Sequence, residues 1–188
     1  MRIAIRHTTH YRFDRPLVHG VQQLRLTPQS NLGQSIVDWQ LTIKGAQIEA
    51  EYEDQNRNRT ILASALPGAL EIAISCEGLV DTRDCGGIFG PHNGFMPLWL
   101  YCNQTPLTAP GPKMRAVAAS LKAEASDNLD LLHRLSAKIL AAVRYEIGRT
   151  TASTLAEHAL AEGHGVCQDH AHVFIGCARL LGIPARYV

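Results

Sequence analysis

The sequence lacks the features that mark membrane, nucleic-acid-binding and secreted proteins. No apolar run approaches the roughly 20 residues that a membrane span needs. The 18 Lys and Arg residues are balanced by 17 Asp and Glu, which leaves no broad charge to attract nucleic acid or an anionic membrane. The first residues, MRIAIRHTTHYRF, are interrupted by charges and do not resemble a signal peptide. We therefore expect a cytoplasmic protein with neither a nucleic-acid nor a membrane partner.

Cysteine occurs, but not in the patterns of disulfide frameworks or zinc ribbons. An odd, widely spaced set without an export signal is typical of free thiols in a reducing compartment, and the five are Cys76, Cys85, Cys102, Cys167 and Cys177. No CxxC pair is present. One set, His164, Cys167 and His170, offers three metal ligands and an open fourth position. We expect no metal and no cofactor, and keep this set as the metal alternative.

The first 80 residues alternate apolar and polar side chains as β-strands do. Turn residues separate the alternating runs, which predict strands at 3–13, 37–43, 48–52, 60–64 and 70–76. In the second run we expect Val37, Trp39, Leu41 and Ile43 to share one face. Strands at this spacing favour an antiparallel sandwich or barrel over residues 1–80.

Residues 81–112 are rich in Gly and Pro, which predicts an irregular connection. Its apolar stretch 97-PLWLY-101 is interpreted as a docked strand or an interface plug. After it, Pro112 suits the first position of a helix, and apolar residues at steps of three and four predict a second helix near 128–146. These helices open a third region, residues 113–188.

The end of the chain predicts two more helices and the start of a strand. Thr154 and Glu157 fit a capping box before a short helix that Gly163 would close. A further helix is predicted from Cys167 to Leu181, because Gly182 and Pro184 stop it. The last residues, 185–188, read as a strand.

Cys167 is the candidate reactive residue because it begins this last helix. Backbone N–H groups in a first turn lack intrahelical partners, and the helix dipole is positive there, so both favour a thiolate. The helix is apolar on nearly all sides, which predicts that it is buried and holds its N-terminus rigidly. From composition alone an inert buried cysteine remains equally open. Cys177, in mid-helix, is interpreted as core filler.

The run from 154 to 188 resembles the core of the bacterial transglutaminase-like family, whose members include cysteine proteases. Gly165, Cys167 and Asp169 match its G-x-C-x-D motif, and 182-GIPARYV-188 matches the segment after its apolar helix. Shorter cues for the family's N-terminal β-rich domain are 10-HYRFDRPL-17, 24-LRLTP-28, Asp54 and Asn58.

The resemblance implies an α+β protein: an N-terminal antiparallel β-sandwich-like domain followed by the helical first half of a papain-like core. It implies a Cys-His-Asp triad in which Cys167 attacks a carboxamide or peptide carbonyl of a protein or peptide substrate, and a thioester forms. The family's His and Asp follow the Cys by several tens of residues, so both would lie beyond position 188. The 188-residue chain alone is therefore expected to be inactive.

Further roles are expected for the residues next to Cys167 and for the rest of the chain. Gln168 or nearby backbone N–H groups are candidates for holding the oxyanion, and Asp169 is expected to cap the helix rather than do chemistry. A homo-oligomer is expected to cover the apolar faces of the last helix. The alternative function is a non-catalytic protein-binding module that uses the β domain.

Overall fold

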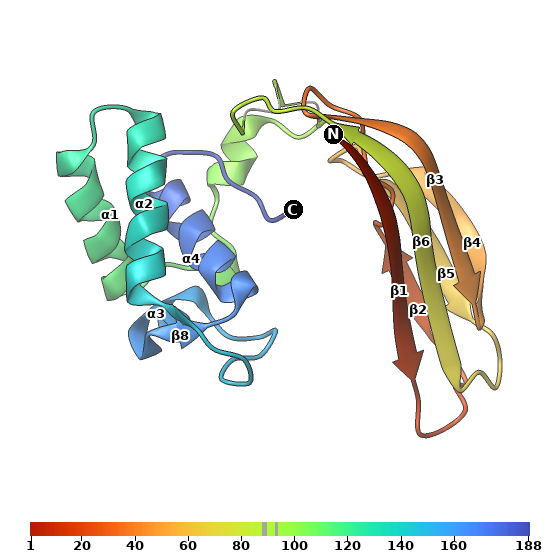
Figure 1. Ribbon diagram of the computed structural model, residues 1–188. Coiled ribbons are helices and arrows are strands. Elements are labelled where there is room, and N and C mark those ends of the chain that lie inside the picture. The colour runs from red at the N-terminus through yellow and green to blue at the C-terminus, as the bar shows by residue number, and fades with distance from the viewer. Residues whose placement is uncertain (88–89, 93) are drawn as a thin grey trace. The chain divides into compact units, whose positions relative to one another are not determined.

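The alternating residues of the first region form two three-stranded antiparallel sheets in the computed structural model (Figure 1). The strand order of one sheet is β1-β6-β3, with bounds Arg2–Arg12, Glu71–Thr82 and Gln34–Lys44. The order of the other is β2-β5-β4, with bounds Val21–Leu24, Arg59–Ala65 and Ala46–Glu53. All five predicted strands are present. The short strand β2 was not predicted.

The hydrophobic core of this region takes side chains from both sheets. Leu24, Ile61 and Ala63 of one sheet and Ile72 and Ile74 of the other form one buried cluster. Burying such apolar side chains contributes roughly 1.5–3 kcal/mol each for the larger ones. The two antiparallel sheets therefore stabilise each other through their inner faces.

The prediction that Val37 shares a face of its strand with Trp39, Leu41 and Ile43 is wrong. The pairing of β3 with β6 shifts register between Ile36 and Asp38, so Val37 is the extra residue of a β-bulge. A bulge reverses the alternation beyond it, and Val37 is 49% exposed. Ile36 takes the inward side on the N-terminal part of the strand, whereas Trp39 lies inward beyond the bulge as predicted.

Asp54 holds the turn between β4 and β5. It is buried and accepts hydrogen bonds from Arg25 Nε at 2.7 Å, from the backbone N–H groups of Asn56 and Asn58, and from the Asn58 side chain. Burial opposes ionisation, but the bonds from Arg25 and Asn58 outweigh it and hold the pKa of Asp54 well below its usual range. The turn therefore depends on a buried carboxylate.

The structure describes residues 1–87, 90–92 and 94–188, which divide into two units, Met1–Met96 and Pro97–Val188. Antiparallel sheets followed by helices confirm the α+β class. The expected boundary at 80 falls inside β6, and the expected connection 81–112 spans the end of one unit and the start of the next. Residues 88, 89 and 93 of that connection lie outside the described residues.

The second unit is helical. Its α-helices are α1 (Pro112–Glu124), α2 (Asn128–Ala142), α3 (Ala156–Glu162) and α4 (Cys167–Leu180). Two 3-10 helices, η1 (Leu98–Cys102) and η2 (Pro106–Thr108), precede them, and β7 (Arg144–Tyr145) pairs in parallel with β8 (His164–Gly165). The predicted helices are confirmed, although α2 ends four residues early. The strand prediction at 185–188 is wrong, because the segment forms no strand. Of the two alternatives for 97–101, the docked strand is wrong because the segment forms η1, and the interface plug stays a prediction.

The helix α4 packs against α1, α2 and α3 (Figure 1). Its Val173 and Cys177 are completely buried in a cluster with Met114 of α1 and with Leu135 of α2. Ala171 and Phe174 remain half-buried. Most of the apolar surface of α4 is thus covered within the unit. No helix in the described ranges is both long and apolar enough to cross a bilayer.

The predicted capping box of α3 is wrong, and the reason is tertiary. The helix begins at Ala156, and Thr154 accepts a hydrogen bond from the Thr151 N–H instead. The Glu157 carboxylate reaches the start of α1, where it accepts the N–H groups of Gly111, Lys113 and Met114 at 3.0, 2.7 and 3.1 Å. One side chain thereby satisfies three backbone donors of another helix. Gly163 ends α3 with φ 73°, as predicted.

Candidate active site

Cys167 is the first residue of α4, where the sequence predicted it. Val166 before it is extended and forms the N-cap, and Cys167 itself is exposed. The thiol therefore lies in the first turn of a helix whose later turns are buried. Unpaired N–H groups and the positive end of the dipole favour a negative charge at this position.

Cys177 has the opposite environment, although it lies on the same helix. It is completely buried, and its Sγ contacts the Met114 carbonyl oxygen at 3.7 Å. Burial raises the pKa of Cys177 to about 12, and the negative charge of Glu157 adds to the effect. The expectation that Cys177 fills the core is confirmed.

Asp169 ties the first turn of α4 to the loop before it. The carboxylate is 1% exposed and accepts the Val166 N–H at 2.8 Å and the Thr150 hydroxyl at 2.6 Å. This is the contact of a helix cap. A Cβ on Gly165 would lie 2.7 Å from the Asp169 Cβ, so only glycine fits there. The G-x-C-x-D spacing thus has a packing reason in addition to any chemical one.

The side chains next to Cys167 are engaged with the backbone. The Gln168 amide nitrogen donates to the Ala152 carbonyl oxygen at 3.3 Å, so this side chain must leave its partner before it can hold an oxyanion. His170 Nδ1 lies 2.9 Å from the Val166 carbonyl oxygen, and Nε2 lies 2.8 Å from the Val143 carbonyl oxygen. Both nitrogens of His170 are therefore turned toward carbonyl groups.

The metal alternative finds no support in the geometry. Over residues 1–87, 90–92 and 94–188 the structure has no group of three His, Cys, Asp or Glu side chains that could hold an ion. The contacts of His170 explain why His164, Cys167 and His170 do not assemble, since a metal ligand must present a free lone pair.

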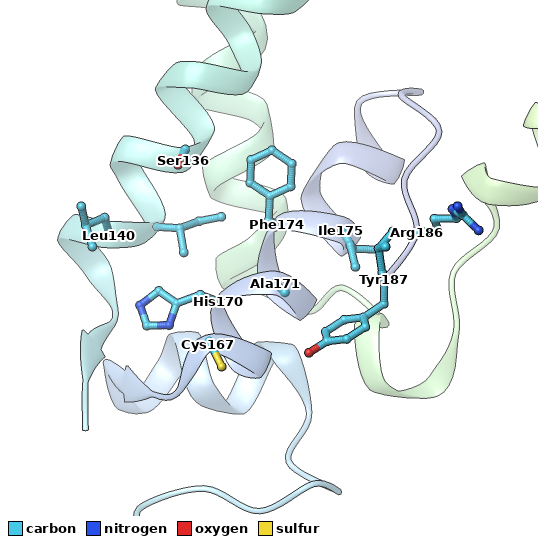
Figure 2. Close-up of a pocket in the computed structure, with 11 residues that line it drawn as sticks. Ser136, Leu140, Cys167, His170, Ala171, Phe174, Ile175, Arg186 and Tyr187 are labelled. Atoms are coloured by element: carbon cyan, nitrogen blue, oxygen red, sulfur yellow. The ribbon is translucent and has the colours of Figure 1, made fainter. Parts of the chain in front are cut away.

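A cavity of about 550 Å³ opens beside Cys167. Figure 2 shows the Cys167 sulfur at one end, with His170 and Tyr187 on either side of it, while Leu140, Ala171, Phe174 and Ile175 supply apolar walls. Arg186 also lines the cavity, and its guanidinium group points away from the Cys167 sulfur in Figure 2. A substrate carbonyl at the sulfur would have apolar surface available for the groups around it.

Two residues that hold the segment after α4 were not predicted from the sequence. His172 is buried and packs edge-on against the Tyr187 ring, with centroids 5.6 Å apart. Arg179 donates to the carbonyl oxygens of Tyr101 and Ala185. The available signal was the presence of an imidazole and a cation among the apolar residues that follow the first turn of α4.

The arrangement of the helices and the exposed Cys167 at the start of α4 are those of a thiol-enzyme-like fold. Comparisons with known proteins identify the family. The bacterial transglutaminase-like N-terminal region matches residues 3–81, and the transglutaminase-like superfamily core matches residues 115–188. The chain belongs to the bacterial transglutaminase-like proteins, as the resemblance predicted.

The comparisons also find similar chains in other bacteria. Uncharacterized proteins of Mycobacterium tuberculosis and Mycobacterium bovis are 26% identical over 202 aligned positions, covering 100% of this chain and 64% of theirs. A crystal structure from Cytophaga hutchinsonii, described as a candidate cysteine protease, matches with a TM-score of 0.76 at 19% identity. That match covers 98% of this chain and 65% of the other. The chain thus spans less than two thirds of the length of these relatives.

Proposed function

We propose that this chain is part of a thiol enzyme of the transglutaminase-like type and that Cys167 is its nucleophile. The observation that carries the proposal is an exposed thiol at the first residue of a buried, apolar helix, next to a cavity. Rigid placement in a positive microenvironment is what nucleophilic catalysis by cysteine requires. The family membership supports the same reading.

The proposed reaction is acyl transfer through a thioester. The Cys167 thiolate bonds to the carbonyl carbon of a carboxamide or peptide group, and the carbon–nitrogen bond breaks. The leaving nitrogen takes a proton from a general acid and departs as ammonia or an amine. Water or a second amine then attacks the thioester, giving an acid or a new amide and releasing the thiolate. The reaction is thus hydrolysis or transfer on a protein or peptide.

The acid and base of this reaction are proposed to come from outside residues 1–188. The resemblance assigns these roles to a His and an Asp that follow the cysteine by several tens of residues, and no residue here matches them. His170 is a poor substitute, because its two nitrogens lie against the carbonyl groups of Val166 and Val143. We therefore expect the 188-residue chain to be inactive alone.

Oxyanion stabilisation is proposed for backbone N–H groups in the first turn of α4. Donors there point out of the helix start and need no side-chain rearrangement, whereas the Gln168 amide is bonded to Ala152. The Asp169 carboxylate holds this turn by accepting a hydrogen bond from the Val166 N–H. The proposal therefore assigns Asp169 to holding the site and Cys167 to the chemistry.

The test is activity in a protein extended beyond residue 188. Ammonia release from glutamine-containing peptides, amine incorporation and peptide cleavage should each be assayed. We expect Cys167→Ala to lose activity and Cys177→Ala to retain most of it. Equal loss in both variants, with intact folding by circular dichroism, contradicts the assignment. Full activity in Cys167→Ala also contradicts it. No activity of the unmodified extended protein in any of the three assays favours the alternative, a non-catalytic protein-binding module that uses the β domain.

A further inference from the structure

His170 contacts two carbonyl oxygens that belong to different segments of the second unit. Val166 is the N-cap of α4, and Val143 is the C-cap of α2. The two distances, 2.9 Å from Nδ1 and 2.8 Å from Nε2, are those of normal hydrogen bonds. The imidazole ring thus bridges the start of the helix that carries Cys167 to the end of the helix beside it.

The chemistry of the two partners restricts the form of the ring. A backbone carbonyl oxygen only accepts hydrogen bonds, so each ring nitrogen must carry a hydrogen to bond it. A neutral imidazole has one N–H, and an imidazolium has two. Only the doubly protonated ring satisfies both contacts at once. His170 therefore brings a positive charge when both hydrogen bonds are made.

This charge would lie close to the thiol. Residues three apart on a helix have Cβ atoms about 5–6 Å apart, and Cys167 and His170 line the same cavity (Figure 2). In Figure 2 the sulfur points away from the ring, so direct proton transfer between them is not the natural role. A fixed cation at this distance still favours a thiolate over a thiol.

We propose that His170 is a positioning residue for Cys167: as an imidazolium it fastens the first turn of α4 to the end of α2 and stabilises the thiolate electrostatically. The role rests on the proposed function of Cys167. It differs from that of a general base, because both nitrogens are occupied as donors. The neighbouring parallel pair β7–β8, in which Arg144 N–H donates to the Gly163 carbonyl oxygen, holds the same junction.

Other groups around the ring set the electrostatic balance. The walls that α2 contributes to the cavity are Ser136, Ile139 and Leu140, none of which is charged. The titratable or charged side chains on α4 and the other adjoining segments are Cys167, Asp169, Arg186, Tyr187, Arg144, Tyr145, Glu146 and His164. The Asp169 carboxylate opposes a thiolate at Cys167 and favours a cation at His170. The Arg186 guanidinium points away from the His170 ring in Figure 2, whereas the two carbonyl oxygens lie against the ring and favour a cation there. Glu146 pairs with Arg144 at 2.7 Å and with Arg149 at 2.7 Å.

The first test reads the ring directly in the unmodified protein. Proton–nitrogen NMR of the 15N-labelled 188-residue protein at neutral pH should show two hydrogen-bonded N–H signals from the His170 ring, both protected from solvent exchange. A ring with one N–H, or with none protected, overturns the proposal. This readout needs no activity and no variant, so it holds even if a substitution unfolds the protein.

The second test measures the effect on the sulfur. In His170→Phe, alkylation of Cys167 by iodoacetamide near pH 7 should slow about tenfold, the loss expected for removing a nearby charge. The deficit should vanish near pH 9.5, where thiols ionise without help. His133→Phe, at an exposed position on α2, is the control and should change nothing. An unchanged Cys167 rate in folded His170→Phe contradicts the proposal.

The outcomes separate this inference from the proposed function. If Cys167 in the unmodified protein alkylates no faster than Cys85, the proposed reactivity of Cys167 fails. The two ring N–H signals then decide the structural role of His170 alone. If Cys167 is fast and remains equally fast in His170→Phe at every pH, the nucleophile stands and the role of His170 fails.

Discussion

Replacing Asp169 by alanine tests whether this carboxylate is the structural support of the candidate site. The substitution removes an acceptor that is 1% exposed and leaves the Val166 N–H and the Thr150 hydroxyl without their partner. Hydrogen bonds to a charged group contribute about 1.5–3 kcal/mol each. Because the two share one acceptor they are not additive, and we expect a loss of about 3 kcal/mol in the free energy of unfolding.

Urea unfolding followed by far-ultraviolet circular dichroism measures this loss. The control is Asp127→Ala, which removes the N-cap of α2 at an exposed position and should destabilise clearly less. Asp169→Asn keeps one acceptor oxygen and should lie between the two, with Cys167 alkylation within about threefold of the unmodified rate. A loss in Asp169→Ala no larger than in Asp127→Ala refutes the structural role. Near-normal stability in Asp169→Asn with Cys167 alkylation abolished would instead give Asp169 a chemical one.

Three further expectations address the rest of the chain. Glu157→Ala should lower the free energy of unfolding in urea by about 2 kcal/mol, because three N–H groups at the start of α1 lose their acceptor. The control is Glu162→Ala, at an exposed position on the same helix as Glu157, which should lose little. Equal losses in the two variants contradict the role of Glu157 in holding α1. The folded pKa of Asp54 is depressed, so its stabilisation is present above the unfolded value of about 3.9 and is lost as pH falls below it. Asp54→Asn should flatten that fall in thermal unfolding between about pH 5 and pH 2, and an unchanged pH profile contradicts it. Light scattering should find self-association through the half-buried face around Phe174, and a clean monomer would count against it.

Local patterns predicted those parts of the fold that depend on neighbours in sequence. Alternation located five strands, and Pro112 and Gly163 marked helix ends through their own backbone preferences. Val37 escaped prediction because a bulge depends on how two strands pair, which a single strand's pattern does not carry. Glu157 was assigned to the wrong helix for a similar reason, since its partners lie more than 40 residues away.

In the candidate site, too, the sequence predicted only what depends on neighbouring residues. The position of Cys167 at a helix start followed from local signals, and Asp169 followed from capping rules. The bridge made by His170 joins α4 to the end of α2, 27 residues earlier in the chain. His172 and Arg179 likewise act on segments that the helix meets only after folding. The sequence alone therefore did not predict which tertiary partners the polar residues of this buried helix contact.

The central claim, that Cys167 is the activated thiol, is tested most directly by competitive alkylation of all five cysteines in the native protein. A limiting amount of iodoacetamide near pH 7 is followed by peptide mass mapping. We predict that Cys167 is modified first, that Cys85 and Cys102 follow slowly, and that buried Cys76 and Cys177 are protected. Modification of Cys167 at the same rate as Cys85 and Cys102, or more slowly, would contradict it.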